Sequence, residues 1–354
     1  MTGGQYDILI VGAGAAGCAA AISLPTGARA ILIDRGDPAS PGQAPTAGRC
    51  CGGLLAPDAQ RALRRLGLDL PEKVRVRPEP KAVRVRDLDT NLAQRYARDY
   101  RNVDRAEFDS WLLNLASERA EFRPHTRLDG LVRTATGVEV RLTSAGGRAE
   151  TVHAALAIGA DGALSATRRV AFPDRPGPPT MLAIQARLES ARPPDDHEVL
   201  FARHLTDFYA WAIPKAGSVL VGAAFGDGRT AKARFEKVLE AMRREFGLEG
   251  RVIERCARHL GRPHAKRQLF GGGGRVLLVG EAAGLVSPSS GEGLSFAFET
   301  GLAAGRAAGE SAPAGAYLAT FRRQARRVRR KFIKARVIFS PPCRRWALHI
   351  PWCP

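Results

Sequence analysis

The order of apolar and polar residues at the start of the chain predicts a strand, a turn and a helix. Residues 6–11 form a short, continuous apolar run, which is typical of a strand buried in a parallel sheet. Gly12-Ala13-Gly14-Ala15-Ala16-Gly17 follows at once, and an alanine-rich stretch predicts a helix that reaches about Leu24. A second apolar run at 29–33 predicts another strand, which ends before Asp34. The pattern is that of a β-α-β unit with a glycine-rich first turn.

A second strand–turn–helix pattern lies near the other end of the chain, at residues 275–301. The run RVLLVG predicts a buried strand after the four glycines at 271–274. Gly280-Glu281 ends this strand with a carboxylate, and SPSSGEG leads into a helix that begins near Leu294. The segment contains no GxGxxG sequence, so its turn differs in kind from the first one.

Residues 172–268, between these two patterns, contain shorter apolar runs. EVLFARH, DFYAWAIP and SVLVGAAFG lie at hairpin spacing, with Ala216-Gly217 in one of the turns, and they predict an antiparallel sheet. In DFYAWAIPK, Tyr209 and Trp211 are two positions apart, so we expect both on one face of a strand that Pro214 ends.

The C-terminal segment has the period of a helix. Its apolar residues follow one another at intervals of three and four, and they predict one apolar face among Arg and Lys: Leu318, Phe321, Ala325, Val328, Phe332, Ala335 and Phe339. Trp346 and Trp352 follow. The stretch from Ser311 to Pro354 contains eleven Arg and Lys and no Asp or Glu. Residues 1–310 therefore carry only +8 of the net charge of +19.

This basic segment has three interpretations. Its amphipathic helix and tryptophans fit adsorption to an anionic membrane surface through residues 318–352. A helix docked on the body of the protein, with a solvated charged face, fits equally well. The third is nucleic-acid binding, which the charge alone would serve; no fold signature for base readout accompanies it, so we do not expect nucleic acid to be a partner.

The 354 residues suffice for two domains or one large interleaved unit. No run approaches 18 consecutive apolar residues, so we expect no transmembrane helix. The N-terminus enters a strand without the charged region or the cleavage site of a signal peptide. We therefore expect a cytoplasmic protein, associated at most with the inner face of the membrane, in which all six cysteines are reduced.

The glycines of the first turn have the spacing that a dinucleotide requires. Gly12 permits the tight turn, Gly14 lets the backbone approach a pyrophosphate, and Gly17 lets the helix pack closely on the strand. The helix N-terminus, at Ala15 and Ala16, offers N–H groups to the anion, and Asp34 can accept from ribose hydroxyls. We include Arg35 in this predicted site. The motif does not distinguish FAD from NAD.

The segment at 275–301 resembles the FAD-dependent family that includes p-hydroxybenzoate hydroxylase, flavin halogenases and geranylgeranyl reductases. The resemblance implies that Gly280 and Glu281 lie at the ribityl chain and that the N–H groups from Gly291 through Gly293 to Leu294 face the flavin N1–C2=O edge, where they would stabilise reduced flavin. Glu281 stands where the family has Asp, and its side chain is one methylene longer.

Two further stretches resemble the same family. NVDRAEFDSWLL, at 102–113, implies a role for Arg105 near the ribityl or pyrophosphate region, with a helix salt bridge as the alternative. In GADGALSATRR, at 159–169, Asp161 and Gly162 would shape the pyrophosphate end, and Arg168 would serve structure or the docking of a reductant.

The adjacent cysteines of GRCCGGLLAP, at 48–57, cannot form an unstrained disulfide with each other, and no CxxC or His cluster completes a zinc site, so we predict no metal. Geranylgeranyl reductases carry a similar Cys-Gly-Gly loop against the flavin, which Cys51-Gly52-Gly53 matches. We favour packing for Cys51 over proton donation, and we regard Cys50 as incidental. In the same branch, aromatics at Tyr209 and Trp211 would line the substrate cavity; core packing is the alternative.

These features predict an α/β fold with an α+β substrate layer: a Rossmann-type FAD-binding domain (1–80, 100–171 and 270–310), an inserted antiparallel-sheet substrate domain (81–99 and 172–269) and a basic helical tail (311–354). The expected function is an FAD-dependent oxidoreductase of the geranylgeranyl reductase type, acting on an apolar isoprenoid, quinone or lipid-like substrate, with transient reduction by NAD(P)H or another donor. An aromatic monooxygenase is the alternative, and a non-catalytic or nucleic-acid-associated flavoprotein a distant third.

Overall fold

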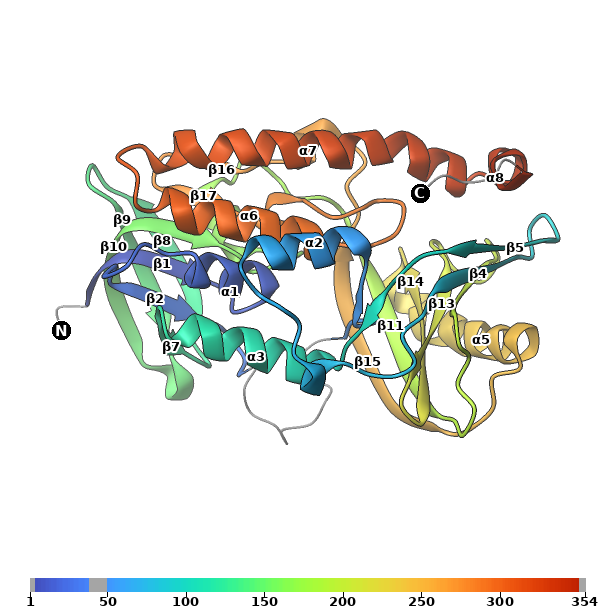
Figure 1. Ribbon diagram of the computed structural model, residues 1–354. Coiled ribbons are helices and arrows are strands. Elements are labelled where there is room, and N and C mark those ends of the chain that lie inside the picture. Colours follow the sequence, from blue (N-terminus) through green and yellow to red (C-terminus); the bar gives the residue numbers. More distant parts are fainter. Residues whose placement is uncertain (1–3, 38–49, 350–354) are drawn as a thin grey trace.

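The computed structural model describes residues 4–37 and 50–349, and within these ranges the chain builds two large β-sheets (Figure 1). The first sheet has eight strands. Its main path runs β16 (Gly272–Gly273), β17 (Val276–Leu278), β10 (Ala149–Gly159), β1 (Gln5–Val11), β2 (Ala30–Ile33) and β7 (Glu121–Arg123). Off this path, β9 (Val138–Thr143) pairs with β10 on one side and with β8 (Arg127–Arg133) on the other.

The centre of the first sheet is parallel. β1 pairs in parallel with β10 and β2, and β10 pairs in parallel with β17. Alternate side chains of these strands enter different cores, as period-two geometry requires. Ile8 and Ile10 pack toward helices, whereas Leu9 and Val11 pack toward β8 and β9. Because both faces are covered, the strands are apolar throughout, as the sequence indicated.

Helices cover one face of the first sheet and a β-meander covers the other. The helical side contains α1 (Ala15–Ile22), α2 (Pro57–Arg65), α3 (Arg105–Ser117), α6 (Leu294–Ala307) and α7 (Pro313–Ile338). The short helix α4 (Ala166–Ala171) packs with β8 and β9 on the opposite side. The α/β fold class with a Rossmann-type domain is confirmed.

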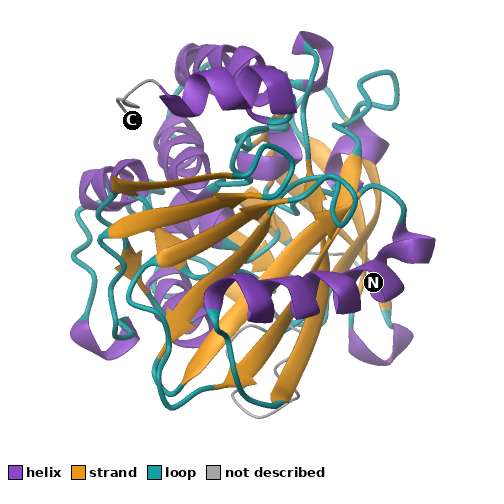
Figure 2. Cartoon of the chain, turned by 90° about the vertical axis from the view of Figure 1, so that its right-hand side faces the viewer, coloured by secondary structure: helices purple, strands orange, loops and turns teal. Residues whose placement is uncertain are grey.

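The second sheet has seven strands in the order β15 (Val252–Gly261), β11 (Thr180–Glu189), β14 (Ser218–Phe225), β13 (Ala210–Lys215), β12 (His197–Phe201), β4 (Ala82–Asp87) and β5 (Leu92–Ala97). All pairs are antiparallel except β12 with β4. Pro214 does not end its strand as the sequence suggested, because β13 continues to Lys215. Figure 2 views the molecule from the side of this sheet.

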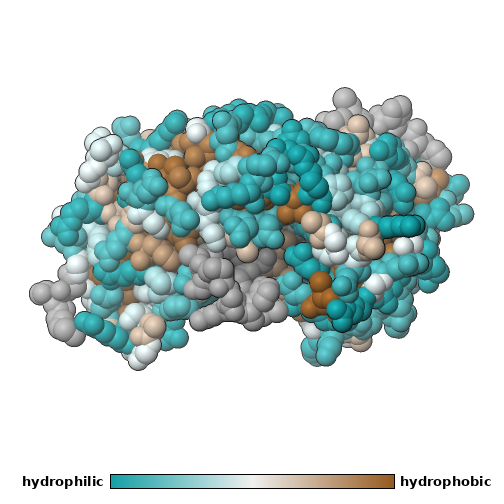
Figure 3. All heavy atoms as spheres, turned by 60° about the horizontal axis from the view of Figure 1, so that its bottom comes forward, coloured by the Kyte–Doolittle hydropathy of each residue, from teal (hydrophilic) through white to brown (hydrophobic). Residues whose placement is uncertain are grey.

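The two faces of the second sheet differ in character. Helix α5 (Gly228–Phe246) packs on one face through Phe235, Val238 and Met242. The other face is rich in aromatic rings, including Phe201, Phe208 and Tyr209. A small two-stranded sheet, β3 (Leu54–Leu55) with β6 (Arg101–Asn102), lies elsewhere in the chain. The surface drawn in Figure 3 is mostly hydrophilic, with small apolar areas between polar side chains.

The C-terminal segment is a long helix, α7, followed by α8 (Pro341–His349). The predicted apolar face of α7 is docked on the body: Phe321 and Val328 are buried in the helical core of the first sheet. Phe339, just after α7, packs against the aromatic face of the second sheet. Within the described residues, no helix is long and apolar enough to cross a membrane.

Candidate functional site

The glycine-rich turn joins β1 to α1 with almost no space for side chains. Gly12 has φ = 103°, in the left-handed region that favours glycine, and its N–H donates to the carbonyl of Ile33 at 2.7 Å. A Cβ on Gly17 would lie 1.8 Å from the Gly12 carbonyl oxygen. Helix α1 begins after Gly14 without a side-chain cap and without an acidic residue in its first turn, so its N-terminus is suited to an anion.

Asp34 ties the end of β2 to this turn. Its Oδ2 accepts from the N–H of Ala13 at 2.8 Å, and its Oδ1 accepts from the N–H of Gly36 at 2.9 Å. Arg35, next to it, is exposed. The carboxylate therefore lies beside the glycine-rich turn, as a ribose-binding residue of a dinucleotide site must; its bond to ribose stays a prediction.

The turn that follows β17 packs against the glycine-rich turn after β1, and the contact is at Gly280. Gly280 has φ = 54°, and a Cβ there would lie 3.1 Å from the Cβ of Ala16. Its N–H donates to Thr300 Oγ1 at 2.9 Å, inside α6. Helix α6 begins at Leu294 after Gly293, again without a side-chain cap or an acidic first turn. Two helices thus start uncapped beside two close-packed glycine turns, a cradle that fits an extended dinucleotide such as FAD.

Two half-buried carboxylates of the predicted site accept hydrogen bonds from backbone N–H groups of their own chain. Glu281 Oε1 accepts from the N–H of Gly261 at 2.7 Å, and burial raises the pKa of Glu281. Asp161 Oδ2 accepts from the N–H of Thr167 at 2.9 Å, in the first turn of α4, and burial also raises the pKa of Asp161. Both side chains shape turns at the site, and their contacts with a cofactor stay predictions.

Arg168 has a structural role. Its guanidinium, only 3% exposed, donates to four backbone carbonyls, those of Arg175, Pro176, Gln268 and Ala282. This set joins α4 to the segment that precedes Gly284. Of the two roles suggested by the sequence, the structure supports the structural one, because the guanidinium is not exposed to a docking partner.

Cys51 and Arg105 lie together. Arg105 Nη1 is 2.9 Å from the Cys51 sulfur, and its Nη2 donates to both oxygens of Asp109, at 2.9 and 3.0 Å. Asp109 lies one turn further along α3, so the helix salt bridge considered from the sequence exists. The same guanidinium also holds the thiol, a contact that the sequence did not indicate.

The Cys-Gly-Gly loop packs directly on β13. A Cβ on Gly52 would lie 2.4 Å from Ile213 Cδ1, and one on Gly53, which has φ = 68°, would lie 2.4 Å from the carbonyl oxygen of Val103. Small residues are therefore required at both positions for the loop to approach the strand. The loop occupies the interface between the two sheets, beside the start of α3.

Lys215 is a site residue that sequence reasoning missed. Its side chain is buried, and its Nζ donates to Asn102 Oδ1 at 2.6 Å and to the Val103 carbonyl at 2.8 Å. Burial lowers the pKa of Lys215 to about 7. A Cβ on Gly53 would lie 2.8 Å from this Nζ. The alternation 209, 211, 213, 215 along the strand could have placed this lysine on the same face as Trp211.

Tyr209 and Trp211 belong to an aromatic wall on the second sheet. Tyr209 stacks on Phe208 with ring centroids 4.4 Å apart and meets Trp211 edge-on at 5.9 Å. Its hydroxyl donates to the carbonyl of Ser290 at 2.7 Å, so the wall adjoins the turn before α6. Burial raises the pKa of Tyr209. Phe339 stacks on Phe208 at 4.9 Å from the C-terminal side.

The turn before α6 is held by a polar network. A Cβ on Gly291, which has φ = 67°, would lie 3.2 Å from Leu260 Cδ2. Glu292 pairs with Arg98 at 3.0 Å and accepts from the Tyr100 hydroxyl at 3.2 Å. His197 packs edge-on against Tyr100, and its two ring nitrogens are buried without a hydrogen-bond partner among the described residues.

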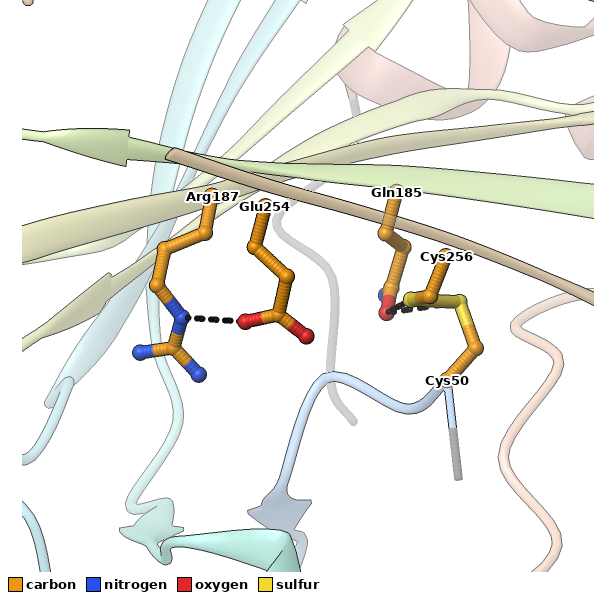
Figure 4. The surroundings of a disulfide bond; sticks show 5 residues. All are labelled: Cys50, Gln185, Arg187, Glu254 and Cys256. Atoms are coloured by element: carbon orange, nitrogen blue, oxygen red, sulfur yellow. Dashed lines mark hydrogen bonds and ion pairs between the residues drawn. A yellow bond between two sulfur atoms is a disulfide. The ribbon is translucent and has the colours of Figure 1, made fainter. Parts of the chain in front are cut away.

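The structure contradicts the expectation that all six cysteines are reduced: Cys50 and Cys256 form a disulfide (Figure 4). Cys256 lies on β15, and Gln185 of β11 lies beside the bond, with its Oε1 3.3 Å from the Cys50 sulfur. Cys50 is therefore not incidental. The pairing spans 206 residues and is created by the approach of the two sheets, which spacing along the chain cannot reveal.

The predicted residues form two groups in space. The turn residues Gly12, Gly14, Ala15, Ala16, Gly17, Asp34, Gly280, Gly293 and Leu294 surround the starts of α1 and α6. Cys51, Gly52, Gly53 and Arg105 lie where the two sheets meet, next to β13. Among residues 4–37 and 50–349, no group of three or more His, Cys, Asp or Glu side chains is arranged to hold a metal ion.

Comparison with known proteins agrees with this geometry. The family described as FAD binding domain matches residues 5–308. Protein CbrA of Escherichia coli O9:H4 (strain HS) is 31% identical over 358 residues, which cover 98% of this chain and 95% of that protein. Protein CbrA of Shigella sonnei (strain Ss046) is also 31% identical, over 98% of both chains.

Solved structures share the fold at low sequence identity. A geranylgeranyl bacteriochlorophyll reductase-like protein from Thermoplasma acidophilum superposes with a TM-score of 0.78 at 19% identity, over 95% of this chain and 88% of that chain. PqsL from Pseudomonas aeruginosa, in complex with 2-aminobenzoylacetate, has a TM-score of 0.71 at 17% identity, over 97% and 98%. The flavin-dependent halogenase CmlS has a TM-score of 0.72 at 21% identity, over 96% and 64%. At these identities the likeness shows the fold alone.

Proposed function

This chain belongs to the FAD binding domain family, and from that premise we propose that it acts as a geranylgeranyl reductase does. It is an FAD-dependent oxidoreductase of the p-hydroxybenzoate hydroxylase-like superfamily. In this proposal, bound FAD would supply hydride or electron chemistry at its N5, to or from an apolar substrate of isoprenoid, quinone or lipid-like chemistry. NAD(P)H or another reductant would dock transiently, because no separate nicotinamide domain is evident in the sequence.

One observation carries the proposal: the Cys-Gly-Gly loop and the aromatic strand β13 are in contact. Gly52 packs on Ile213, and Gly53 packs beside Lys215, two residues further along the strand. Trp211 precedes Ile213 on the same strand. The two features by which the sequence resembles geranylgeranyl reductases therefore form one wall, adjoining the turn before α6 through Tyr209 and Ser290.

The residues of this wall have distinct tasks in the proposed reaction. Bound FAD supplies the hydride chemistry. Tyr209, Trp211 and Phe208 offer apolar rings to a substrate and exclude water from it. Arg105 holds the Cys51 thiol at 2.9 Å and so fixes its position at the sheet interface. Lys215, with its pKa lowered to about 7 by burial, can hold or release a proton near neutral pH.

The test is anaerobic reduction of the FAD-loaded protein, followed by mixing with polyprenyl lipids, quinones and phenols in the presence and absence of oxygen. We expect an isoprenoid or quinone to reoxidise the flavin without oxygen, with a product that has gained two hydrogens. Reoxidation that requires oxygen and hydroxylates a phenol would instead establish the aromatic monooxygenase.

Variants of Trp211 connect the activity to the wall. Trp211→Ala should raise KM for the apolar acceptor about tenfold, since a large apolar contact is lost, with kcat less affected. Trp211→Phe retains a ring and should remain close to the parent protein. Flavin content, measured by absorbance, should be the same in both variants. If Trp211→Ala and Trp211→Phe have equal KM values, Trp211 does not contact the substrate.

A further inference from the structure

Helix α7 does not offer its apolar face to a partner, because the body of the protein already covers it. Tyr317, Phe321, Gln324 and Val328 are buried against the helical core of the first sheet. Tyr317 also donates its hydroxyl to the carbonyl of Leu278 in β17. Insertion of this face into a lipid bilayer is therefore excluded in the docked structure, and any binding must use the opposite face.

The opposite face of α7 carries a line of cations. We call its four arginines the arginine stripe. These arginines and the isoleucine that lies among them are all exposed: Arg322, Arg326, Arg329, Ile333 and Arg336. They follow one another at intervals of four, three, four and three residues, so they lie on one side of the helix. At 1.5 Å per residue, the stripe is about 21 Å long.

No carboxylate neutralises this stripe. Within residues 4–37 and 50–349, none of its four guanidinium groups forms an ion pair with Asp or Glu, and residues 311–354 contain no acidic side chain at all. Some arginines elsewhere on the surface are neutralised by a carboxylate: Arg234 contacts Asp207 at 2.6 Å and Arg255 contacts Glu236 at 2.5 Å. What distinguishes this face is that four unneutralised guanidinium groups lie in one line along a single helix, an arrangement complementary to an anionic surface.

Exposed apolar side chains accompany the charge. Ile333 lies within the stripe and is 70% exposed, and Trp346 on α8 is 70% exposed as well. Nucleic acid offers phosphates to the arginines, but an isoleucine on the outer face of a straight helix has no partner on a duplex backbone. At a lipid headgroup boundary, by contrast, cations bind anionic lipids while Ile and Trp side chains enter the interface.

We propose that the arginine stripe, with Ile333 and Trp346, is the surface by which this protein binds an anionic phospholipid bilayer. The binding is electrostatic, with two short apolar side chains as anchors, and it leaves α7 docked on the body. Phe339, just after the end of α7, stacks on Phe208 of the aromatic wall, so the helix that carries the stripe ends at that wall. The proposal concerns binding alone and stands or falls independently of the reaction that the enzyme catalyses.

The test is co-sedimentation of the full-length, FAD-loaded protein with extruded vesicles. Vesicles of equal parts phosphatidylglycerol and phosphatidylcholine should sediment the protein at low salt and release it at high salt, because screening weakens exposed charges. Pure phosphatidylcholine vesicles should not bind it. The triple variant R322Q/R326Q/R329Q should lower the partition coefficient about 100-fold, at about fivefold per arginine.

Two further variants separate the stripe from net charge. R229Q/K232Q/K237Q removes three exposed cations from α5, on the second sheet, and should bind as the parent does. I333S/W346S keeps every charge and should weaken binding about tenfold with an unchanged salt dependence.

Three results would overturn the proposal. Equal losses in the α5 variant and the stripe variant would mean that only total charge matters. Equal binding to neutral and anionic vesicles would exclude the electrostatic mechanism. Tighter binding to a 30-nucleotide RNA or DNA duplex than to the anionic vesicles, at the same salt concentration, would assign the stripe to nucleic acid.

Discussion

Gly17 is the residue of the turn with the least room for a side chain. A Cβ there would lie 1.8 Å from the carbonyl oxygen of Gly12, so Gly17→Ala must push α1 away from the end of β1. Because the N-terminus of α1 belongs to the pyrophosphate cradle, we expect the purified variant to lose more than nine-tenths of its FAD. Absorbance near 450 nm against protein content measures this.

Gly315→Ala is the matched control for that variant. Gly315 lies in α7 and a Cβ there meets nothing within 4 Å, so the change should keep the flavin and stabilise the helix by about 0.5–1 kcal/mol. Full flavin content in Gly17→Ala would show that the first turn is not the dinucleotide cradle.

His197 makes the fold sensitive to acid. Burial, together with Arg98, lowers the pKa of His197 to about 3, while the unfolded chain has the ordinary value near 6.5. Between these values the unfolded state binds the extra proton, so stability is complete above pH 6.5 and is lost as the pH falls toward 3. At pH 4.5, about two pH units below the unfolded pKa, the loss is on the order of 3 kcal/mol.

The variant His197→Phe removes this proton and keeps a ring against Tyr100. Urea unfolding at pH 7 and pH 4.5 should give a smaller pH-dependent loss than in the parent protein, by about 2–3 kcal/mol. If the two proteins lose equal stability between these pH values, His197 is not the group that titrates.

The individual residues whose places the sequence predicted are those whose contacts lie within a short stretch of the chain. Gly12, Gly17 and Asp34 act within one β-α-β unit, so their spacing alone predicts their places. Cys50 and Lys215 were missed or misjudged because their roles depend on partners far along the chain, Cys256 and Asn102. Spacing carries no information on such partners.

Helix α8 is fastened to the second sheet by one buried cation. Arg344, 3% exposed, reaches Asp87 at 2.6 Å and Asp89 at 2.7 Å, and Asp87 itself is fully buried. Burial alone would raise the pKa of Asp87, but the bonds from Arg344 and Thr90 hold it below its usual range. This pair joins the C-terminal segment to the end of β4, while α7 is docked on the first sheet.

Arg344→Met leaves those carboxylates without their cation. We expect the free energy of unfolding to fall by about 3–5 kcal/mol, as for other broken buried ion pairs. The neighbouring Arg345 is exposed, and Arg345→Met should cost less than about 0.5 kcal/mol. Urea titrations measure both. Similar losses in the two variants, or no recovery when Asp87→Asn is added to Arg344→Met, would contradict the buried pair.

Elements were predictable from the sequence where one periodic pattern decided them. The strand at 5–11, the helix that begins at Leu294 and the amphipathic α7 follow from their own apolar residues. The sequence could not decide which surface α7 covers, because its apolar face fits lipid and protein equally. The parallel pairing of β12 with β4 was equally hidden, since it joins strands from distant parts of the chain.

At the scale of the whole molecule, the disulfide connects the Cys-Gly-Gly loop to the edge strand of the second sheet. Cys50 and Cys256 close a loop of 206 residues, which in the chain-entropy account stabilises the fold by up to about 5 kcal/mol. Dithiothreitol should therefore lower the free energy of unfolding of the parent protein and leave Cys256→Ser unchanged.

Cys343→Ser is the control for that experiment, because Cys343 is an exposed free thiol. It should respond to the reductant as the parent protein does. A reductant effect of the same size in Cys256→Ser would place its origin outside this bond. Mass spectrometry of the alkylated protein, with and without reduction, counts the thiols in each case.

The strand order also governs how the protein can be made. On the ribosome, β4 leaves the exit tunnel long before β12, its parallel neighbour at His197–Phe201, and β1 precedes β10 by a similar stretch. At roughly 5–20 residues per second, about a hundred residues of delay leave these strand edges unpaired for on the order of 10 s. Nascent chains should therefore be clients of holdase chaperones, and faster elongation should increase the soluble yield by shortening that wait.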